Sequence, residues 1–116
     1  MTASALTEWV ALFLPELIPD GQGGSREVPP ANLEPDTPAS VRMMSSSETA
    51  SQEQAAQRVR YLVTIRYEPS ITAAYRVYWQ SRYLEIDGPP ANVGYADKWL
   101  ELQCVQREAG EIYGGN

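Results

Sequence analysis

The sequence contains no histidine and only one cysteine, Cys104, among its 116 residues. Without histidine it lacks the commonest general base and metal ligand of proteins. A lone thiol cannot form an intrachain disulfide or a thiolate cage for a metal. Cys104 lies in a run with strand-like alternation, where a small buried side chain is expected. The sequence therefore predicts a protein that is not an enzyme and has no metal site and no cofactor.

Long apolar runs are also missing. No stretch approaches the ~18 apolar residues of a membrane-spanning helix, and the first residues lack the basic-then-apolar pattern of a secretion signal. We therefore expect an intracellular, soluble protein with no membrane partner.

Positive charge is scarce in the first half of the chain. The net charge is −6; residues 1–57 carry eight acids and two arginines, whereas residues 58–116 carry seven basic and seven acidic groups. Non-specific binding to phosphates requires clustered cations. The balance therefore argues against a protein that holds nucleic acid by charge alone.

The stretch Arg58–Ile86 carries five of the nine basic residues and five of the seven tyrosines. Its first ten residues, RVRYLVTIRY, alternate strictly, as in a β-strand with one buried side and one solvent-facing side. The buried side is predicted to carry Val63 and Ile65, and the outer side Arg60 and Arg66.

Other alternating segments stand between turn signals, and little of the chain favours a helix. Strands are expected near residues 10–14, 25–28, 39–44, 75–80, 82–86 and 99–105. The pattern predicts an all-β fold, a small antiparallel β-barrel or sandwich of about six or seven strands, with a long loop or short helix inserted. We expect one domain over residues 1–116, with a core of Val63, Ile65, Val77, Trp79, Leu100 and Leu102.

Two segments differ in composition from these strands. Residues 45–57, SSSETASQEQAAQ, have no large apolar side chain, so a helix there could not dock firmly on a core. We expect a flexible polar loop, or a loop that becomes ordered against a neighbouring subunit. The tail at residues 108–116 contains three glycines and is expected to be flexible.

The arginines and tyrosines of Arg58–Ile86 also suit a barrel that binds single-stranded nucleic acid by stacking and charge. Tyr61 and Tyr67, however, fall on the valine and isoleucine side of the predicted strand. This function is kept as an alternative.

Four short motifs, in this order, resemble the head–tail joining (head-closure or stopper) proteins of long-tailed bacteriophages, which also occur in phage-derived gene transfer particles. The motifs are VTIRY at 63–67, SIT at 70–72, LEI at 84–86 and LELQC at 100–104. The resemblance rests on their order and spacing and covers about residues 10–108.

The resemblance implies a small β-barrel with a structural, non-enzymatic role. It implies a homo-oligomeric ring of sixfold or twelvefold symmetry in the virion neck, assembled in the bacterial cytoplasm. The ring's partners are the portal-bound adaptor ring above it and the tail terminator or tail tube below it. Double-stranded DNA passes through its channel without sequence-specific binding. Another neck component, a tail terminator or an adaptor, is the nearest alternative.

On this hypothesis the 45–57 loop faces the channel, a gate or the next subunit. Its candidate residues are Ser45, Ser46, Ser47, Glu48, Gln52, Glu53 and Gln54. The arginines are expected to meet acidic side chains of neighbouring subunits, and the candidates are Arg58, Arg60, Arg66 and Arg76.

Overall fold

The structure is a computed structural model that describes residues 5–44 and 59–106. Nearly all of the regular structure in these ranges is β-strand. The strands are β1 (Glu8–Phe13), β2 (Glu16–Pro19), β3 (Ser25–Val28), β4 (Thr37–Met43), β5 (Arg60–Arg66), β6 (Arg76–Trp79), β7 (Arg82–Ile86), β8 (Ala91–Asn92) and β9 (Trp99–Gln106), with one 3₁₀ turn, η2 (Val93–Tyr95).

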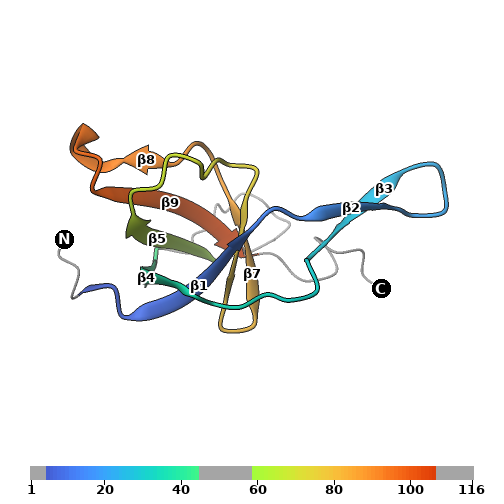
Figure 1. Cartoon of the computed structure of the whole chain (residues 1–116), viewed down its shortest axis with the longest axis horizontal. Helices are drawn as coiled ribbons and strands as arrows, with labels where there is room; N and C mark the ends of the chain where they lie inside the picture. The colour runs from blue at the N-terminus through green and yellow to red at the C-terminus, as the bar shows by residue number, and fades with distance from the viewer. Residues whose placement is uncertain (1–4, 45–58, 107–116) are drawn as a thin grey trace, which may run out of the picture.

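Six of the strands close into an antiparallel barrel (Figure 1). Their order is β5-β4-β1-β6-β7-β9, and β9 pairs back onto β5 through seven residue pairs, from Arg60↔Val105 to Arg66↔Trp99. The short strand β8 extends the sheet beyond β9. The predicted all-β barrel is thereby confirmed, and closure removes the free edges that an open sheet would expose.

The alternation of the sequence decides which side chains enter the barrel. Tyr61, Val63 and Ile65 of β5 are buried, whereas Arg60 and Arg66 are exposed on the outside. Five of the six predicted core residues are buried, namely Val63, Ile65, Val77, Leu100 and Leu102.

Trp79 is the exception, because it is only partly buried against the core. Its ring packs edge-on against Tyr61, with centroids 5.3 Å apart, and its Nε1 donates a hydrogen bond of 3.0 Å to Glu8 Oε1. An indole N–H needs a polar partner when its ring is buried. Trp79 therefore covers the edge of the core with its N–H turned toward the carboxylate.

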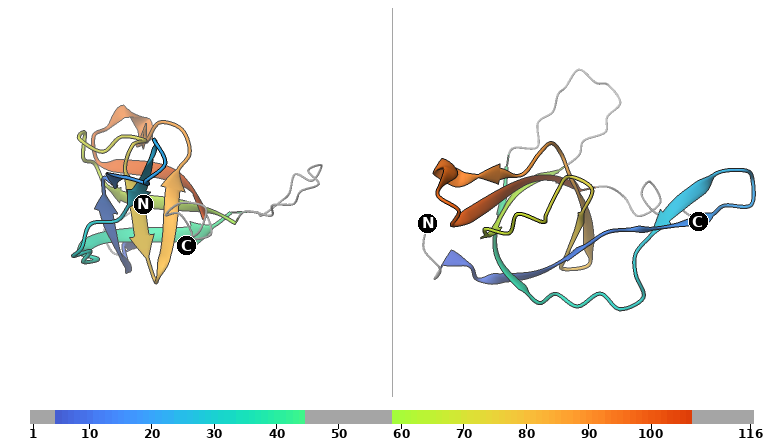
Figure 2. Two further views of the ribbon diagram at one scale, coloured as in Figure 1. Left: turned by 90° about the vertical axis from the view of Figure 1, so that its right-hand side faces the viewer. Right: turned by 45° about the horizontal axis from the view of Figure 1, so that its top comes forward.

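The strand predicted near residues 10–14 corresponds to β1, and a further strand, β2, follows it in the structure. β1 ends at Phe13, before Pro15, and β2 begins at Glu16. β2 and β3 pair with each other alone as a separate two-stranded sheet. This hairpin projects from one side of the barrel (Figures 1 and 2). The return strand expected at residues 25–28 is confirmed as β3.

The predicted loop at 45–57 and tail at 108–116 lie outside the described residues. Within the described ranges, no helix has the length and apolar character needed to cross a membrane.

We expect Leu102→Ala to lower the free energy of unfolding by roughly 2–5 kcal/mol, because Leu102 is fully buried in the barrel and the change leaves a cavity. Leu17→Ala is the matched control. Leu17 is 67% exposed on the hairpin, so its loss should change stability by no more than about 0.5 kcal/mol. Urea denaturation followed by tryptophan fluorescence measures both. Equal losses in the two variants would contradict this description of the core.

Candidate functional site

The features that stand out are exposed surfaces of the described residues. Among them, no group of three or more histidine, cysteine, aspartate or glutamate side chains could hold a metal ion. Cys104 is buried, and burial raises the pKa of its thiol to about 12. The thiol therefore stays protonated and unreactive at neutral pH.

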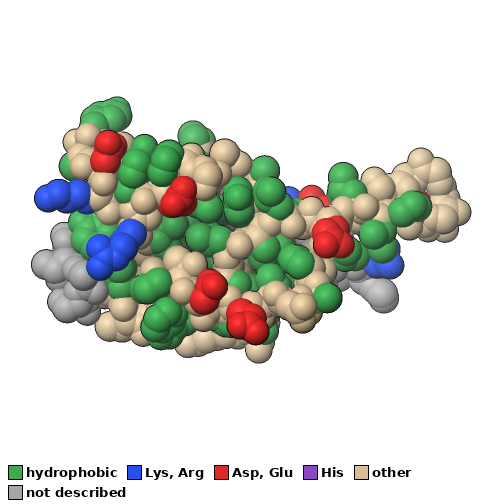
Figure 3. Space-filling view, viewed as in Figure 1, with side chains coloured by type: hydrophobic (Ala, Val, Ile, Leu, Met, Phe, Trp, Pro, Cys, Tyr) green, Lys and Arg blue, Asp and Glu red, His purple; other side chains and the backbone are tan. Residues whose placement is uncertain are grey.

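The hairpin of β2, the turn at residues 20–24 and β3 is the most prominent of these surfaces, and we call it the arm. A two-stranded hairpin is marginally stable in water by itself. The arm nevertheless exposes apolar surface, since Leu17 is 67% exposed and Leu14, where the arm leaves the barrel, is 51% exposed. Hydrophobic side chains also lie along the arm in Figure 3. An exposed apolar projection of this kind is typical of a contact surface.

Arg76 of β6 ties the base of the arm to the barrel. Its Nη2 lies 3.1 and 3.0 Å from the two carboxylate oxygens of Glu27 in β3 and 3.7 Å from Glu85 of β7. The Arg76 side chain is only 12% exposed. Charge-assisted hydrogen bonds that are shielded from water are the stronger ones, so this contact helps to fix the direction of the arm.

Asp20 organises the tip of the arm. Its Oδ1 accepts hydrogen bonds from the backbone N–H groups of Gln22 (2.8 Å) and Gly24 (3.1 Å). These bonds lower the pKa of Asp20 below 3.8, with the bond from Gln22 the larger cause. Gly21 and Gly23 have φ values of 82° and 89°, which other residues rarely adopt. The conformation of the arm is thus fixed at its tip by these hydrogen bonds, and at its base by the contact with Arg76.

The four arginines predicted to meet neighbouring subunits have different surroundings in the structure. Arg58 lies outside the described residues. Arg60 forms an exposed ion pair with Asp87 at 2.9 Å, and the guanidinium of Arg66 lies over the ring of Trp99 at 5.8 Å. Arg76 is engaged within its own chain by the arm.

The sequence analysis missed Arg42 of β4. The β4–β5 register places Arg42 opposite Leu62, and Leu62 shares the outer side of β5 with Arg60 and Arg66. We call this outer side of β4, β5 and β9, with Arg42, Arg60 and Arg66, the arginine face. The alternation of the sequence could have identified it: in ASVRMM (39–44), Arg42 stands between the apolar Val41 and Met43 and so points to the other side of the strand.

The tyrosines beside these arginines are mostly used in packing. Tyr61 is buried, and its hydroxyl group lies 3.2 Å from Gln106 Oε1. Tyr78 and Tyr83 pack against each other with centroids 5.1 Å apart. Rings held in this way do not form the row of free faces on which successive bases stack.

An exposed aromatic lies at the corner between β8 and β9. Tyr95 is 90% exposed and has a φ of 53°, which is costly for a side chain with a Cβ. Two hydrogen bonds between Asn92 and Asp97 hold this corner, from Asn92 Nδ2 to Asp97 Oδ1 at 2.8 Å and from Asp97 N to Asn92 Oδ1 at 3.0 Å. The strained turn presents Tyr95 to the outside.

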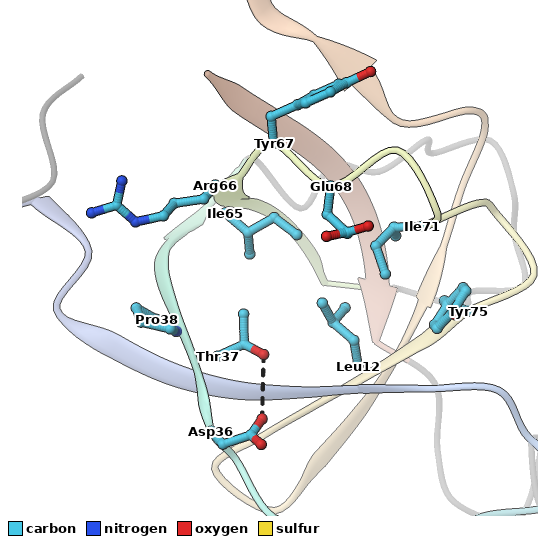
Figure 4. A pocket seen from close by; sticks show the side chains of 10 residues that line it. All are labelled: Leu12, Asp36, Thr37, Pro38, Ile65, Arg66, Tyr67, Glu68, Ile71 and Tyr75. Carbon is cyan, nitrogen blue, oxygen red and sulfur yellow. Dashed lines mark hydrogen bonds between the residues drawn. The ribbon is translucent and has the colours of Figure 1, made fainter. Parts of the chain in front are cut away.

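One pocket of about 440 Å³ opens among the ends of β1, β4 and β5 (Figure 4). Leu12, Ile65 and Ile71 give it apolar walls, and Asp36 and Glu68 contribute carboxylates. Arg66 points away from this space. Within this lining the Thr37 hydroxyl group donates a hydrogen bond of 3.3 Å to Asp36 Oδ1.

Comparisons with known proteins identify the family and the fold. The family described as phage head completion protein matches residues 1–108. The solution structure of protein SF1141 from Shigella flexneri 2a is similar, with 26% identity and a TM-score of 0.59, over 91% of this chain and 96% of that one. A chain of the virion of a native gene transfer agent particle has the same fold, with 19% identity and a TM-score of 0.67, over 88% of this chain and 96% of that one. No curated protein matches.

Acid should loosen the tip of the arm. The folded-state pKa of Asp20 is below the model-compound value of 3.8. The contribution of its hydrogen bonds is therefore complete above that value, and it is lost as the pH falls through the lower, folded-state pKa. The amide signals of Gln22 and Gly24 in ¹H–¹⁵N spectra report this titration.

Asp20→Ala should produce the same loosening at neutral pH, whereas Asp20→Asn, which keeps an acceptor oxygen, should largely preserve the turn. Amide signals of Gln22 and Gly24 that ignored both acid and Asp20→Ala would show that Asp20 does not organise the tip.

Proposed function

The chain belongs to the phage head completion protein family, and from this premise we propose that it is a ring-forming subunit of the virion neck. In this role the ring closes the DNA-filled head below the portal-bound adaptor and presents a docking surface to the tail terminator or tail tube. The family match over residues 1–108 carries the proposal, because it spans nearly the whole barrel-forming chain. The virion is accordingly the protein's location.

The charge of the chain suits a passage for DNA. Double-stranded DNA is densely negative, and cations clustered along a channel would hold it in place. A chain with a net charge of −6 would let the duplex slide. We propose that the polar loop at residues 45–57 faces this channel or the neighbouring subunit, since its small and polar side chains can change position without exposing apolar surface.

The rivals are less well supported. An adaptor is expected to be more helical, whereas the described residues contain nine strands and very little helix. A barrel that binds single-stranded nucleic acid needs free aromatic faces, and Tyr61 is buried. A tail terminator would share the virion location, so the stage at which particle assembly fails separates it from head closure.

Particles assembled without this chain should still package DNA, but their heads should not stay closed. We expect such heads to lose their DNA and to carry no tails, as measured by nuclease protection of the DNA and by electron microscopy. Supplying the wild-type chain should restore both properties. Tailless heads that keep their DNA would point to a tail terminator, and normal particles would refute a neck role.

Replacing residues 45–57 with a Gly/Ser linker of equal length tests the loop separately. The barrel should keep its thermal midpoint, because this segment offers no large apolar side chain to the core. Particles carrying the variant should leak DNA or fail to join tails. Normal particles with an intact barrel would remove the loop from the mechanism while leaving head closure in place.

A further inference from the structure

We propose that the arm of one copy docks on the arginine face of the next copy, with Leu17 placed against Leu62. This inference rests on the proposed ring and identifies the two surfaces that form it. The arm and the arginine face are different parts of the chain. Their contact is therefore head-to-tail, the type that closes into a ring when the rotation between copies permits.

The two surfaces lie on opposite sides of the subunit. In Figures 1 and 2 the arm leaves the barrel on one side, and β4 and β5 form the wall away from it. A subunit that uses both can therefore contact one neighbour through its arm and another through its arginine face. An arm that folded back on its own barrel could not do this, and the contact with Arg76 at its base keeps it extended.

Strand addition is not the mode of docking that the arm favours. Pro15 precedes β2, Pro19 ends it, and Pro29 and Pro30 follow β3. Proline has no N–H to donate, so these residues interrupt the edges at which another strand could pair. The receiving barrel is closed and offers little free edge in return. The arm is therefore expected to dock through contacts of its side chains.

The apolar parts of the two surfaces correspond. Leu17 stands 67% exposed on the arm. Leu62 is partly exposed and lies opposite Arg42 in the sheet. Burying the two leucines against each other removes apolar surface from water on both copies, which supplies the non-directional part of the attraction.

The charges correspond as well. The arm carries Glu16, Asp20 and Glu27 against the single cation Arg26, and Glu27 is paired with Arg76. In the residues that the structure describes, neither Arg42 nor Arg66 forms an ion pair.

Glu16 points to the side of β2 away from Leu17, because adjacent residues of a strand alternate. A two-stranded ribbon is thin, however, so charges on both of its sides lie within about one Debye length, ~8 Å, of a surface it touches. The attraction therefore aligns the arm and speeds its docking without requiring close ion pairs.

The corner with Tyr95 is the competing receptor, since it too exposes apolar side chains. At this corner Asp97 is balanced by Lys98. The arginine face carries Arg42, Arg60 and Arg66 against Glu101 and the Asp87 that pairs with Arg60, so its balance is positive and an acidic arm gains more from it. The sign of the charge therefore favours the arginine face. The arm is also held at its base and tip before it binds, so little conformational freedom is lost on docking.

Cysteine cross-linking tests the contact directly. The native Cys104 is buried and its thiol stays protonated, so introduced cysteines are the reactive ones. In the full-length chain we expect Leu17→Cys with Leu62→Cys to yield a ladder of disulfide-linked oligomers under mild oxidation. Mixing the two single variants should give covalent dimers, and either single variant alone should give none.

The pair Leu17→Cys with Val93→Cys is the matched control, because Val93 is exposed at the Tyr95 corner. A ladder from the control pair and none from the Leu17–Leu62 pair would overturn the arginine face as the receptor. Assembled rings without either ladder would overturn docking by the arm and leave the proposed ring intact. A wild-type chain that never assembles, alone or in particles, would instead count against the proposed function.

Charge reversal gives an independent readout. Glu16→Arg and Arg66→Glu should each weaken assembly by roughly threefold to tenfold, and the double variant should recover most of the loss. Native mass spectrometry at low and high salt measures the populations. Glu34→Arg makes the same change in net charge at an exposed site away from the arm and should have the smaller effect. Equal effects of the two glutamate variants, or no recovery in the double variant, would contradict docking on the arginine face.

Discussion

The pairing of β9 with β5 is the constraint on which the rest of the structure depends. Seven residue pairs join these strands, which are separated in the sequence by β6, β7 and β8. Without this pairing the sheet would be open, with two unpaired edges and a core accessible to water. Closure buries Val63, Leu84 and Leu102 completely. The strand β5 is fully paired only when β9, the last strand of the chain, has joined it. The fold therefore depends on contacts distant in sequence.

The closed barrel determines what the remaining residues can do. Side chains that point inward are occupied by packing, and those that point outward alternate with them along each strand. Arginines therefore appear on the outer surface at fixed spacings, and their roles are decided by their neighbours. Arg60 meets Asp87, and Arg76 meets Glu27 of the arm. Arg42 and Arg66 have no such acid among the described residues, so their charge remains directed outward.

Much of the barrel could be predicted from the sequence because its strands alternate clearly. RVRYLVTIRY has a single consistent phase, and β5 follows it. The turn between β6 and β7 has only two residues, Gln80 and Ser81, and neither is glycine. Both residues adopt positive φ, 50° and 66°, as the preferred hairpin turn demands. The strong pairing of β6 with β7 on either side compensates for the local cost.

The arm and the arginine face were harder to predict, for physical reasons. Pro15 stands between β1 and β2, but sequence alone does not say that the chain beyond it leaves the barrel. Arg42 is separated from Leu62 by the residues that include the 45–57 segment, and only the β4–β5 register brings them together. Arg76 looked like its neighbours in the alternation. Its distinct role arises from Glu27, a residue far from it in sequence.

The proposed ring sets a closed barrel a specific problem, because closure removes the edges through which β-proteins most readily associate. One solution is to place a separate hairpin outside the barrel, and the arm is such a hairpin. Its prolines limit edge pairing, which protects the isolated protein from open-ended aggregation. The same prolines oblige the arm to act through its side chains. Association then depends on apolar contact and charge. Each such contact is weak by itself, and the contacts add up around the proposed ring. A subunit built in this way can remain separate at low concentration and assemble where a preceding ring gathers its copies.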